Sequence, residues 1–549
     1  MKKLRIYTFV LPLISIVSCN LNKTISQELT KKDDVFFNTI KDTLVNWHLK
    51  DYHNDSIPGI SFEKAYQNIL KKNESSEAII AILDTDVDIH HEFLKKHIWL
   101  NQNEKIDGND NDKNGYIDDI NGWNFISDSI GNSELFVNYE YTRILKKYDS
   151  VFEGISDENV SKSLEKEYFH YKRAKDIYLG RTLYAFKEKN YIDYYLNKSK
   201  QADIALASYF PEKKYTKEKV DSLIKVNSDP SLLPHLNYIL TEIQYNITDK
   251  WLADYKLKTY ERINKLLNKD FDDRVNIGDD IEDLEDMNYG SYIVNKNSEF
   301  LEHGTTVAGV ISSLLKKGNS NIKLMVLCVS SLGDENDKDM ALAIRYAVNN
   351  GAKVINISSG KNFSLHSDWV IKELKNAEEQ DVLVVTSAGN SNTNLDEKDV
   401  FNYPDDTDEN REEVVDNFLK VSSSSYQLTK KFKEEETAYG KTNVDLFAPG
   451  EKIFTASAKK DKKYELSSGT SMAAALTSGV AGLIYSYFPS LSVKQVKKIL
   501  MDSGTSYDIN IEVKQRDGSL KLTPFSELSK SGKVLNSYNA LLMAEKMTK

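Results

Sequence analysis

The sequence predicts an α/β fold with a mostly parallel central sheet flanked by helices, and with an α-helical insertion. Three observations predict it. From Ala78 onward, short runs of aliphatic and β-branched residues alternate with stretches of helical periodicity. Residues with carboxylate, hydroxyl or amide side chains directly follow several of these runs. One long internal segment has a different, glycine-poor composition. Continuous apolar strands separated by helices are typical of parallel sheets that are covered on both faces.

The predicted elements follow in order along the chain. The apolar runs predict strands at 78–83, 323–329, 354–357 and 382–387, and the helical stretches are 304–315, 339–350, 369–380 and 472–487. In open parallel sheets, functional residues lie at the carboxyl ends of the strands. Asp84 and the stretch 387–390 occupy that position.

The glycine-poor segment interrupts this pattern between Asp84 and His303. From Ser133 to Asn276 the only glycines are Gly154 and Gly180, and Lys, Glu and Tyr dominate. Apolar residues recur on one helical face, as in 137–148 and 236–243. We therefore predict a mainly helical insertion at 127–295, between a first part (33–126) and a second part (296–549) of one sheet domain. Prolines at 211, 230 and 234 interrupt the periodicity and make a coiled coil the less favoured alternative.

The N-terminus has the features of an export signal. Residues 1–18 combine a basic start with an apolar stretch at 6–17 that is too short to span a bilayer. The stretch ends in Ile16-Val17-Ser18-Cys19, which resembles a bacterial lipobox, so we expect Cys19 to be lipidated and 19–32 to be a tether. The alternative is an ordinary signal peptide with a chance cysteine. The lipobox predicts an exported, membrane-attached lipoprotein that faces the periplasm or the cell surface.

The composition limits the classes of partner. The 549 residues are 28% charged and 40% hydrophobic, with a formal net charge of -11. This charge argues against a nucleic-acid partner. There are two cysteines. Acylation of Cys19 would leave Cys328 without a disulfide partner, and its apolar surroundings predict a buried, unreactive thiol.

Three polar residues have the types and order needed for nucleophilic catalysis. Ser471 lies in Ser-Gly-Thr-Ser-Met-Ala-Ala, between a tight turn and a run of small residues that can begin a buried helix. A serine hydroxyl needs a base to take its proton, and that base needs an orienting carboxylate. His303, in His-Gly-Thr-Thr-Val-Ala-Gly, and Asp84, at the end of the first apolar run, supply these groups.

These motifs, in the order Asp, His, Ser, resemble those of the subtilisin-like serine proteases, the subtilases. The resemblance covers 78–487. It implies a three-layer subtilisin-like fold in which Asp84 orients His303, His303 is the general base and Ser471 is the nucleophile. It also implies that Asn390, in Ser-Ala-Gly-Asn, donates to the oxyanion. Substrate-binding positions implied by the resemblance are Ser358, Gly360, Ala388 and Gly389.

Two positions depart from the family pattern. Asp86 stands where the family has glycine two residues after the catalytic aspartate. If that backbone needs a positive φ, aspartate is among the better non-glycine residues, and its carboxylate could raise the basicity of the histidine. Ala475 stands where a proline commonly follows the small residues, a change that the start of a helix tolerates. Neither change removes a catalytic group.

The acidic loop 107–119 has oxygen ligands at alternating positions around a glycine bend. Counted from its first ligand, the candidates imitate an EF-hand loop, but Asn121 replaces the final bidentate glutamate. Similar loops in related subtilases are interpreted as calcium sites, so we expect a structural Ca²⁺ ion, with a solvated acidic turn as the alternative. The candidate ligands are Asp110, Asp112, Asn114, the Tyr116 carbonyl, and Asp118 or Asp119.

The leading functional hypothesis is a secreted, membrane-anchored serine endopeptidase that hydrolyses protein or peptide substrates through an acyl-enzyme. The alternatives are a catalytically inactive, subtilase-like binding scaffold and a dedicated processing protease for one exported precursor. The insertion is either a decoration packed on the side of the domain or a partial lid over the active site. The stretches 44–48 and 60–66 resemble packed elements of the catalytic domain, which leaves little chain for a propeptide, so we expect maturation by lipidation and signal removal alone.

A Cys19→Ala variant is expected to leave the membrane fraction, or to remain unprocessed, because acylation requires the thiol. Cell fractionation measures this directly. Unchanged membrane association would rule out lipidation as the anchor.

Overall fold

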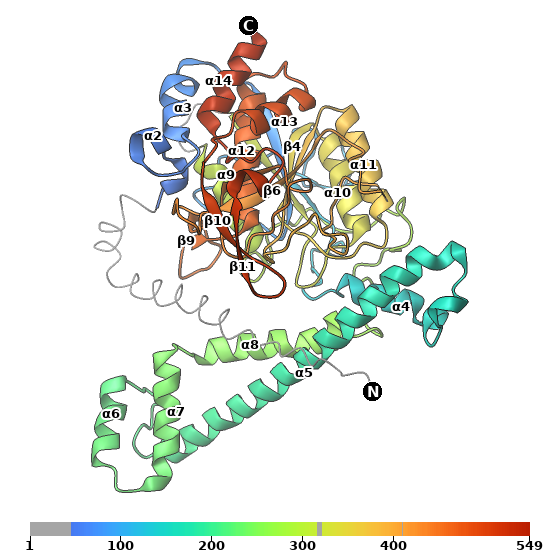
Figure 1. Cartoon of the computed structure of the whole chain (residues 1–549). Coiled ribbons are helices and arrows are strands. Elements are labelled where there is room, and N and C mark those ends of the chain that lie inside the picture. Colours follow the sequence, from blue (N-terminus) through green and yellow to red (C-terminus); the bar gives the residue numbers. More distant parts are fainter. Residues whose placement is uncertain (1–44, 316–320, 409) are drawn as a thin grey trace. The chain divides into compact units, whose positions relative to one another are not determined.

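The computed structural model describes residues 45–315, 321–408 and 410–549 (Figure 1). Cys19 and the predicted signal and tether lie outside these residues. The described chain divides into two compact units. The smaller comprises Leu179–Asn264, and the larger comprises residues 45–178 together with Lys265–Lys549.

The larger unit is built on a seven-stranded sheet with the order β2-β3-β1-β4-β5-β6-β7. Every neighbouring pair of strands in this sheet is parallel. The strands are β1 (Glu77–Asp84), β2 (Gly122–Asn124), β3 (Asn321–Cys328), β4 (Ala352–Ile357), β5 (Leu383–Ser387), β6 (Phe418–Ser424) and β7 (Leu446–Pro449). This arrangement confirms the predicted α/β fold with a parallel central sheet.

Helices cover both faces of the sheet (Figure 1). Side chains of β1 alternate between the two layers: Ile80 and Ile82 enter one core cluster, and Ala81 and Leu83 enter the other. The first cluster includes residues of α9 (His303–Ser313), α12 (Thr470–Tyr487), α13 (Val493–Asp502) and α14 (Ser537–Thr548). The second includes residues of α10 (Asp337–Asn349) and α11 (Ser367–Glu379). A strand buried on both faces has to be apolar throughout, which explains the continuous runs in the sequence.

Helix α12 lies at the centre of the first layer, and all of its residues are buried. Its many alanines and glycines let it approach the sheet closely. The Cβ of an alanine at Gly482 would lie 2.6 Å from a methyl group of Ile80 on β1. The helix begins at Thr470, two residues before the predicted start, so Ser471 lies within its first turn.

The segment before β1 packs into the same core. It contains η1 (Trp47–Leu49), α2 (Tyr52–Asp55), α3 (Phe62–Asn68) and η2 (Leu70–Lys72). Trp47 and Phe62 are both buried in the first core cluster. These stretches are therefore packed elements of the larger unit, as the sequence predicted.

The glycine-poor segment is helical, but it does not form one body. Residues 179–264 form the smaller unit, whose own core contains Leu206, Val220 and Leu236. Residues 127–178 and 265–295 belong to the larger unit. The helices of this segment are α4 (Glu140–Phe152), η3 (Asp157–Asn159), η4 (Lys162–Leu164), α5 (Glu165–Leu206), α6 (Lys217–Val226), η5 (Pro230–Leu232), α7 (Leu233–Gln244), α8 (Asp249–Glu261) and the π-helix η6 (Arg262–Leu266).

Two antiparallel hairpins complete the larger unit. One pairs β8 (Ile453–Ala456) with β9 (Tyr464–Ser467), and the other pairs β10 (Asn510–Lys514) with β11 (Leu520–Pro524), which is followed by η7 (Phe525–Glu527). Within the described ranges, no helix combines the length and the apolar character needed to cross a membrane.

Candidate active site

A carboxylate and an imidazole meet at the carboxyl edge of the sheet. Asp84 is the last residue of β1, the third strand of seven, and only 1% of it is exposed. Its Oδ1 lies 2.7 Å from Nδ1 of His303 and accepts a hydrogen bond of 2.7 Å from the Thr85 backbone. Because Nδ1 faces the carboxylate, Nε2 of His303 is the ring nitrogen left to exchange a proton with another group.

Gly304 makes this contact sterically possible. Its N–H donates to Oγ1 of Thr85 at 2.8 Å, which holds the start of α9 against the residue that follows Asp84. A Cβ at position 304 would lie 2.4 Å from the Thr85 carbonyl oxygen. Only glycine allows this approach, which explains the His-Gly pair in the sequence.

The carboxylate also sets the protonation of His303. Burial disfavours the imidazolium and lowers the pKa of His303, but Asp84 raises it, with further contributions from Glu335 and Glu302. The net result is a pKa above the ordinary value of 6.5. The ring is not sealed off, since 41% of the His303 side chain is exposed. This group is therefore an accessible base near neutral pH.

Ser471 lies in the first turn of α12 and is held by the segment after β4. Its Oγ donates to the carbonyl oxygen of Ser358 at 2.9 Å, and Oγ of Ser358 donates to the Ser471 carbonyl at 3.1 Å. Among the described residues, no hydrogen bond joins Ser471 Oγ to His303. A rotation about the Cα–Cβ bond of Ser471 is the movement that would turn its hydroxyl from one acceptor to the other.

Asn390 lies beside the same turn, and its orientation follows from its partners. Its Oδ1 accepts from the Thr470 backbone N–H at 2.9 Å and from Oγ1 of Thr470 at 3.1 Å. Since a backbone N–H can only donate, the amide oxygen faces Thr470. The NH₂ group of Asn390 makes no hydrogen bond within the described parts of the chain. It is a donor held next to Ser471.

The predicted substrate-binding residues lie after β4 and β5. Ser358 contacts Ser471 as described, and Gly389 donates from its N–H to Oγ1 of Thr470 at 3.1 Å. Ala388 is buried, and its N–H donates to the Val421 carbonyl. The side-chain nitrogen of Asn402 lies 3.3 Å from a Cβ placed on Gly389 and 3.5 Å from one placed on Gly360. Asn402 therefore borders both glycines, and no sequence motif had indicated it.

Asp86 is buried and has an ordinary backbone conformation. It is absent from the residues with positive φ, so this backbone does not need glycine. Burial raises the pKa of Asp86 to about 6, and its Oδ2 accepts from the Asn297 backbone at 2.7 Å. The largest charge contributions that raise the pKa of His303 come from Asp84, Glu335 and Glu302. Asp86 thus stabilises the turn before α9.

The acidic loop forms a cluster of carboxylates, but with a membership that the spacing did not predict. Oxygen atoms of Glu104, Asp112 and Asp119 lie within 4.8 Å of one another. Asn114 joins them by donating to Asp119 at 2.8 Å. Glu104 is 5% exposed, and its Oε2 has no hydrogen-bond partner within the described residues. A buried oxygen without a donor, facing two further carboxylates, fits a hard cation such as Ca²⁺.

Asp110 and Asp118 accept hydrogen bonds from backbone N–H groups, and the Tyr116 carbonyl stays a predicted ligand. Asp110 accepts from the backbones of Asn114 and Gly115, and Asp118 accepts from those of Asp107 and Gly108. The ring of Tyr116 packs in the second core cluster, and its N–H donates to Asn114 Oδ1. These residues shape the turns around the cluster. Glu104 precedes the acidic loop, so the EF-hand-like spacing of that loop did not predict it as a ligand.

Comparison with known proteins finds a family that matches most of the chain. The model of the subtilase family matches residues 75–521. "Subtilisin-like protease 3" of Plasmodium falciparum is 28% identical over 229 residues, which are 38% of this chain and 28% of that protein. The "Major intracellular serine protease" of Bacillus subtilis is 32% identical over 200 residues, 35% of this chain and 57% of that protein. The chain thus spans about a quarter to three fifths of the length of these two relatives.

Among solved structures, a lanthipeptide protease matches with a TM-score of 0.35 and 24% identity, over 44% of this chain and 75% of that chain.

The Asp84–His303 contact predicts the titration of the ring. NMR of isotopically labelled histidine should give His303 a pKa above 6.5 in the wild type. In Asp84→Asn it should fall, since burial still disfavours the imidazolium after the neighbouring negative charge is removed. Titration curves of the other histidines serve as the internal control. An unchanged His303 midpoint in the variant would contradict the assigned contact.

Proposed function

The chain belongs to the subtilase family, and we propose that it is a serine endopeptidase that hydrolyses peptide bonds through an acyl-enzyme at Ser471. The observation that carries this proposal is the 2.7 Å contact between Asp84 and His303, together with Ser471 in the first turn of a buried helix. A base oriented by a carboxylate and a hydroxyl beside the same sheet edge are the groups that acyl transfer needs.

The first step turns the hydroxyl of Ser471 from the Ser358 carbonyl toward Nε2 of His303. The ring takes the proton as the oxygen attacks the scissile carbonyl carbon. Asp84 stabilises the imidazolium that forms, which is the same interaction that raises the pKa of His303 at rest. Bond formation and proton transfer therefore both use the Asp84–His303 pair, which is already formed without substrate.

The tetrahedral intermediate carries a negative oxygen, and two donors are available for it. One is the NH₂ group of Asn390, whose direction is fixed by Thr470. The other is the backbone N–H of Ser471 in the first turn of α12, which donates to no acceptor among the described residues. The positive end of the helix adds to this stabilisation. Preorganised donors of this kind often make the largest electrostatic contribution to acyl transfer.

Collapse of the intermediate breaks the C–N bond, and His303 gives its proton to the leaving amine. Water then attacks the acyl carbon while His303 takes one of its protons. The bond between that carbon and Oγ of Ser471 breaks, His303 returns the proton to Oγ, and the acid product leaves. The chain's own residues supply every proton transfer.

Two alternatives stand beside this proposal. An inactive binding scaffold would keep the fold without turnover, but the preserved Asp84–His303 pair and the free donor of Asn390 favour an enzyme. A dedicated processing protease would use the same chemistry on one exported precursor. Labelling of Ser471 by a fluorophosphonate separates enzyme from scaffold, and cleavage of a peptide library separates broad from dedicated specificity.

We further propose that the enzyme acts outside the cytoplasm, attached to a membrane through Cys19. The lipobox-like sequence before Cys19 supports this. Exported proteins or peptides would then be its substrates.

A structural cation is the third part of the proposal. Glu104, Asp112 and Asp119 would hold Ca²⁺. Asn114 donates to Asp119 and would orient its carboxylate. The ion would neutralise carboxylates that otherwise repel one another, and it takes no part in the chemistry at Ser471. The unpaired Oε2 of Glu104 supports this assignment.

Ser471→Ala is expected to abolish peptide hydrolysis without changing the melting temperature. Asn390→Ala should lower kcat by about a hundredfold to a thousandfold, the range typical for the loss of one oxyanion donor. Steady-state kinetics on a peptide substrate measure both effects, and thermal unfolding checks the fold. Near-wild-type turnover in either variant would show that the roles are wrongly assigned.

Calcium should raise the melting temperature of the wild type, by an amount equivalent to about 2.7 kcal/mol at a hundredfold excess over Kd. Glu104→Gln should lose most of this response, because it removes a ligand charge while keeping the shape. Asp118→Asn is the matched control in the same loop, since Oδ1 of Asp118 accepts from the N–H groups of both Asp107 and Gly108, and an amide oxygen can replace it. A wild-type melting temperature that does not depend on calcium would refute the site, and equal responses in both variants would refute the role of Glu104.

A further inference from the structure

Two loops border the candidate active site, and both are attached to the start of the helical insertion. The first rim loop, 329–336, follows β3, and the second rim loop, 358–366, follows β4. Strands β3 and β4 are the two neighbours of β1, so these loops emerge on either side of Asp84. The first donates from Val329 to the Asp84 carbonyl, and the second holds the hydroxyl of Ser471.

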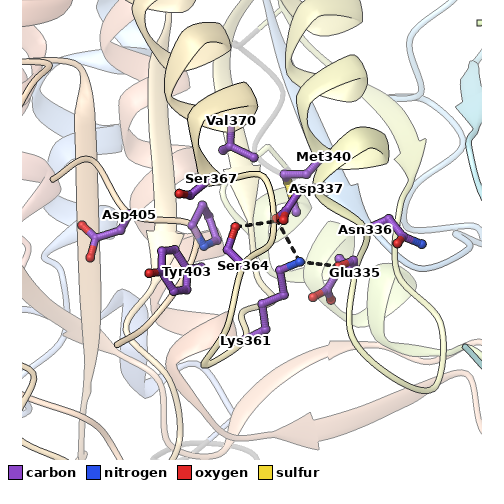
Figure 2. A pocket seen from close by; sticks show the side chains of 11 residues that line it. Glu335, Asn336, Asp337, Met340, Lys361, Ser364, Ser367, Val370, Tyr403 and Asp405 are labelled. Atoms are coloured by element: carbon purple, nitrogen blue, oxygen red, sulfur yellow. Dashed lines mark hydrogen bonds and ion pairs between the residues drawn. The ribbon is translucent and has the colours of Figure 1, made fainter. Parts of the chain in front are cut away.

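Lys361 of the second rim loop reaches across to the first. Its side chain is 6% exposed, and Nζ lies 2.9 Å from Oδ1 of Asp337 and 3.3 Å from Oε1 of Glu140. Nζ also donates to the carbonyl of Glu335 at 2.7 Å (Figure 2). An ammonium group has three donors, and here each has a partner. Lys361 thus joins the second rim loop to the end of the first and to helix α4.

Glu140, at the start of α4, contacts both rim loops itself. Its Oε1 accepts from the backbone of Leu365 at 2.9 Å, and its own N–H donates to Oδ2 of Asp334 at 2.8 Å. Glu140 is 2% exposed. One residue of the insertion therefore fixes a point on each loop.

Arg143 extends the network one helical turn further. Its guanidinium donates to Glu140 at 2.8 Å, to Asp273 at 3.0 Å and to the carbonyl of Asp334 at 2.9 Å. Asp273 lies after the last helix of the insertion, where the chain returns to the larger unit. Both ends of the insertion are therefore tied to the first rim loop.

Backbone pairing supports the first rim loop from the same side. Val137 donates to the carbonyl of Leu332 at 2.9 Å, and Leu332 donates to that of Leu135 at 3.0 Å. Gly333 has φ +141, and a Cβ there would lie 2.2 Å from the Val137 carbonyl oxygen. The segment before α4 thus packs against the rim loop with no space for a side chain.

Buried ion pairs of this kind contribute little net stability, because desolvation offsets most of the attraction. Their geometry is the stronger effect, since each charge must keep its partners or remain buried without one. We propose that the network of Lys361, Glu140, Arg143 and Asp273 is a positioning device. It holds the two rim loops at the separation that an extended peptide needs in order to bind between them. The inference rests on the proposed endopeptidase function. It adds a role in substrate binding for the base of the insertion, by which we mean the parts 127–178 and 265–295 that belong to the larger unit.

A length-dependent kinetic comparison tests the proposal on the full chain. Lys361→Met should raise KM for a tetrapeptide substrate by about tenfold to a hundredfold, in line with the cost of small misplacements in binding sites. The rate of fluorophosphonate labelling at Ser471 should be unchanged, because that small reagent does not span the rim loops. A general loss of folding would instead lower kcat and the labelling of Ser471 together, with KM unchanged.

Lys338→Met is the matched control. Lys338 is also a fully buried lysine, paired with Asp279 at 2.9 Å and with the carbonyl of Asp280 at 2.7 Å, but the hydrogen bonds and ion pairs of its ammonium group involve neither rim loop. It should lower the melting temperature as Lys361→Met does, with KM unchanged. An unchanged KM in folded Lys361→Met, or an equal rise in Lys338→Met, would overturn the inference.

Glu140→Gln provides a second route if Lys361→Met does not fold. The amide keeps an acceptor for Leu365 and removes only the charge, so KM for the tetrapeptide should rise less than in Lys361→Met. The double variant should be no worse than Lys361→Met alone, because both changes act on one unit. Unchanged KM in Glu140→Gln would also overturn the inference. A wild type that neither reacts with fluorophosphonate nor cleaves peptides would overturn the proposed function itself, and with it this inference.

Discussion

The contact between Asp84 and His303 depends on a backbone approach that leaves no room for a side chain. Gly304 lies against the carbonyl of Thr85, and this places the first residue of α9 next to the last residue of β1. The parallel sheet supplies the other groups. Because all seven strands end at the same edge, the segments after β4 and β5 reach the same place as Asp84. Neither the helix nor the sheet alone would assemble these residues.

Helix α12 adds a second constraint on the same site. It is buried over its whole length, and its small residues allow it to lie close to the strands. The depth of this packing fixes Ser471 at the sheet edge, where Ser358 and Asn390 define its surroundings. The NH₂ group of Asn390 and the N–H of Ser471, which we propose as oxyanion donors, are consequently in place before a substrate binds. This agrees with the general expectation that catalytic dipoles are preorganised by packing.

The base of the insertion shares this sheet edge. Residues 135–143 contact the loop after β3, and Arg143 binds Asp273 in the returning segment of the insertion. Glu140 and Lys361 connect the loop after β3 to the loop after β4. The smaller unit, 179–264, has its own apolar core. The insertion thus contains a part that is continuous with the active-site framework and a part that folds around separate contacts. For the second part, a lid and a decoration stay the two alternatives predicted from the sequence.

The sequence by itself determined the elements whose residues carry a strong local signal. Continuous apolar runs predicted the strands of the parallel sheet because both faces of such strands are buried. The motifs around Asp84 and His303 predicted two groups that lie 2.7 Å apart, and Gly304 is required by their close packing. That Ser471 acts with this pair stays a prediction. Contacts between residues far apart in the chain were decided only by the tertiary structure. Glu104 completes the acidic cluster, Asn402 borders two glycines, and Lys361 joins Glu140 across two loops. None of these has a neighbouring motif, because each depends on side chains that folding brings together from separate elements.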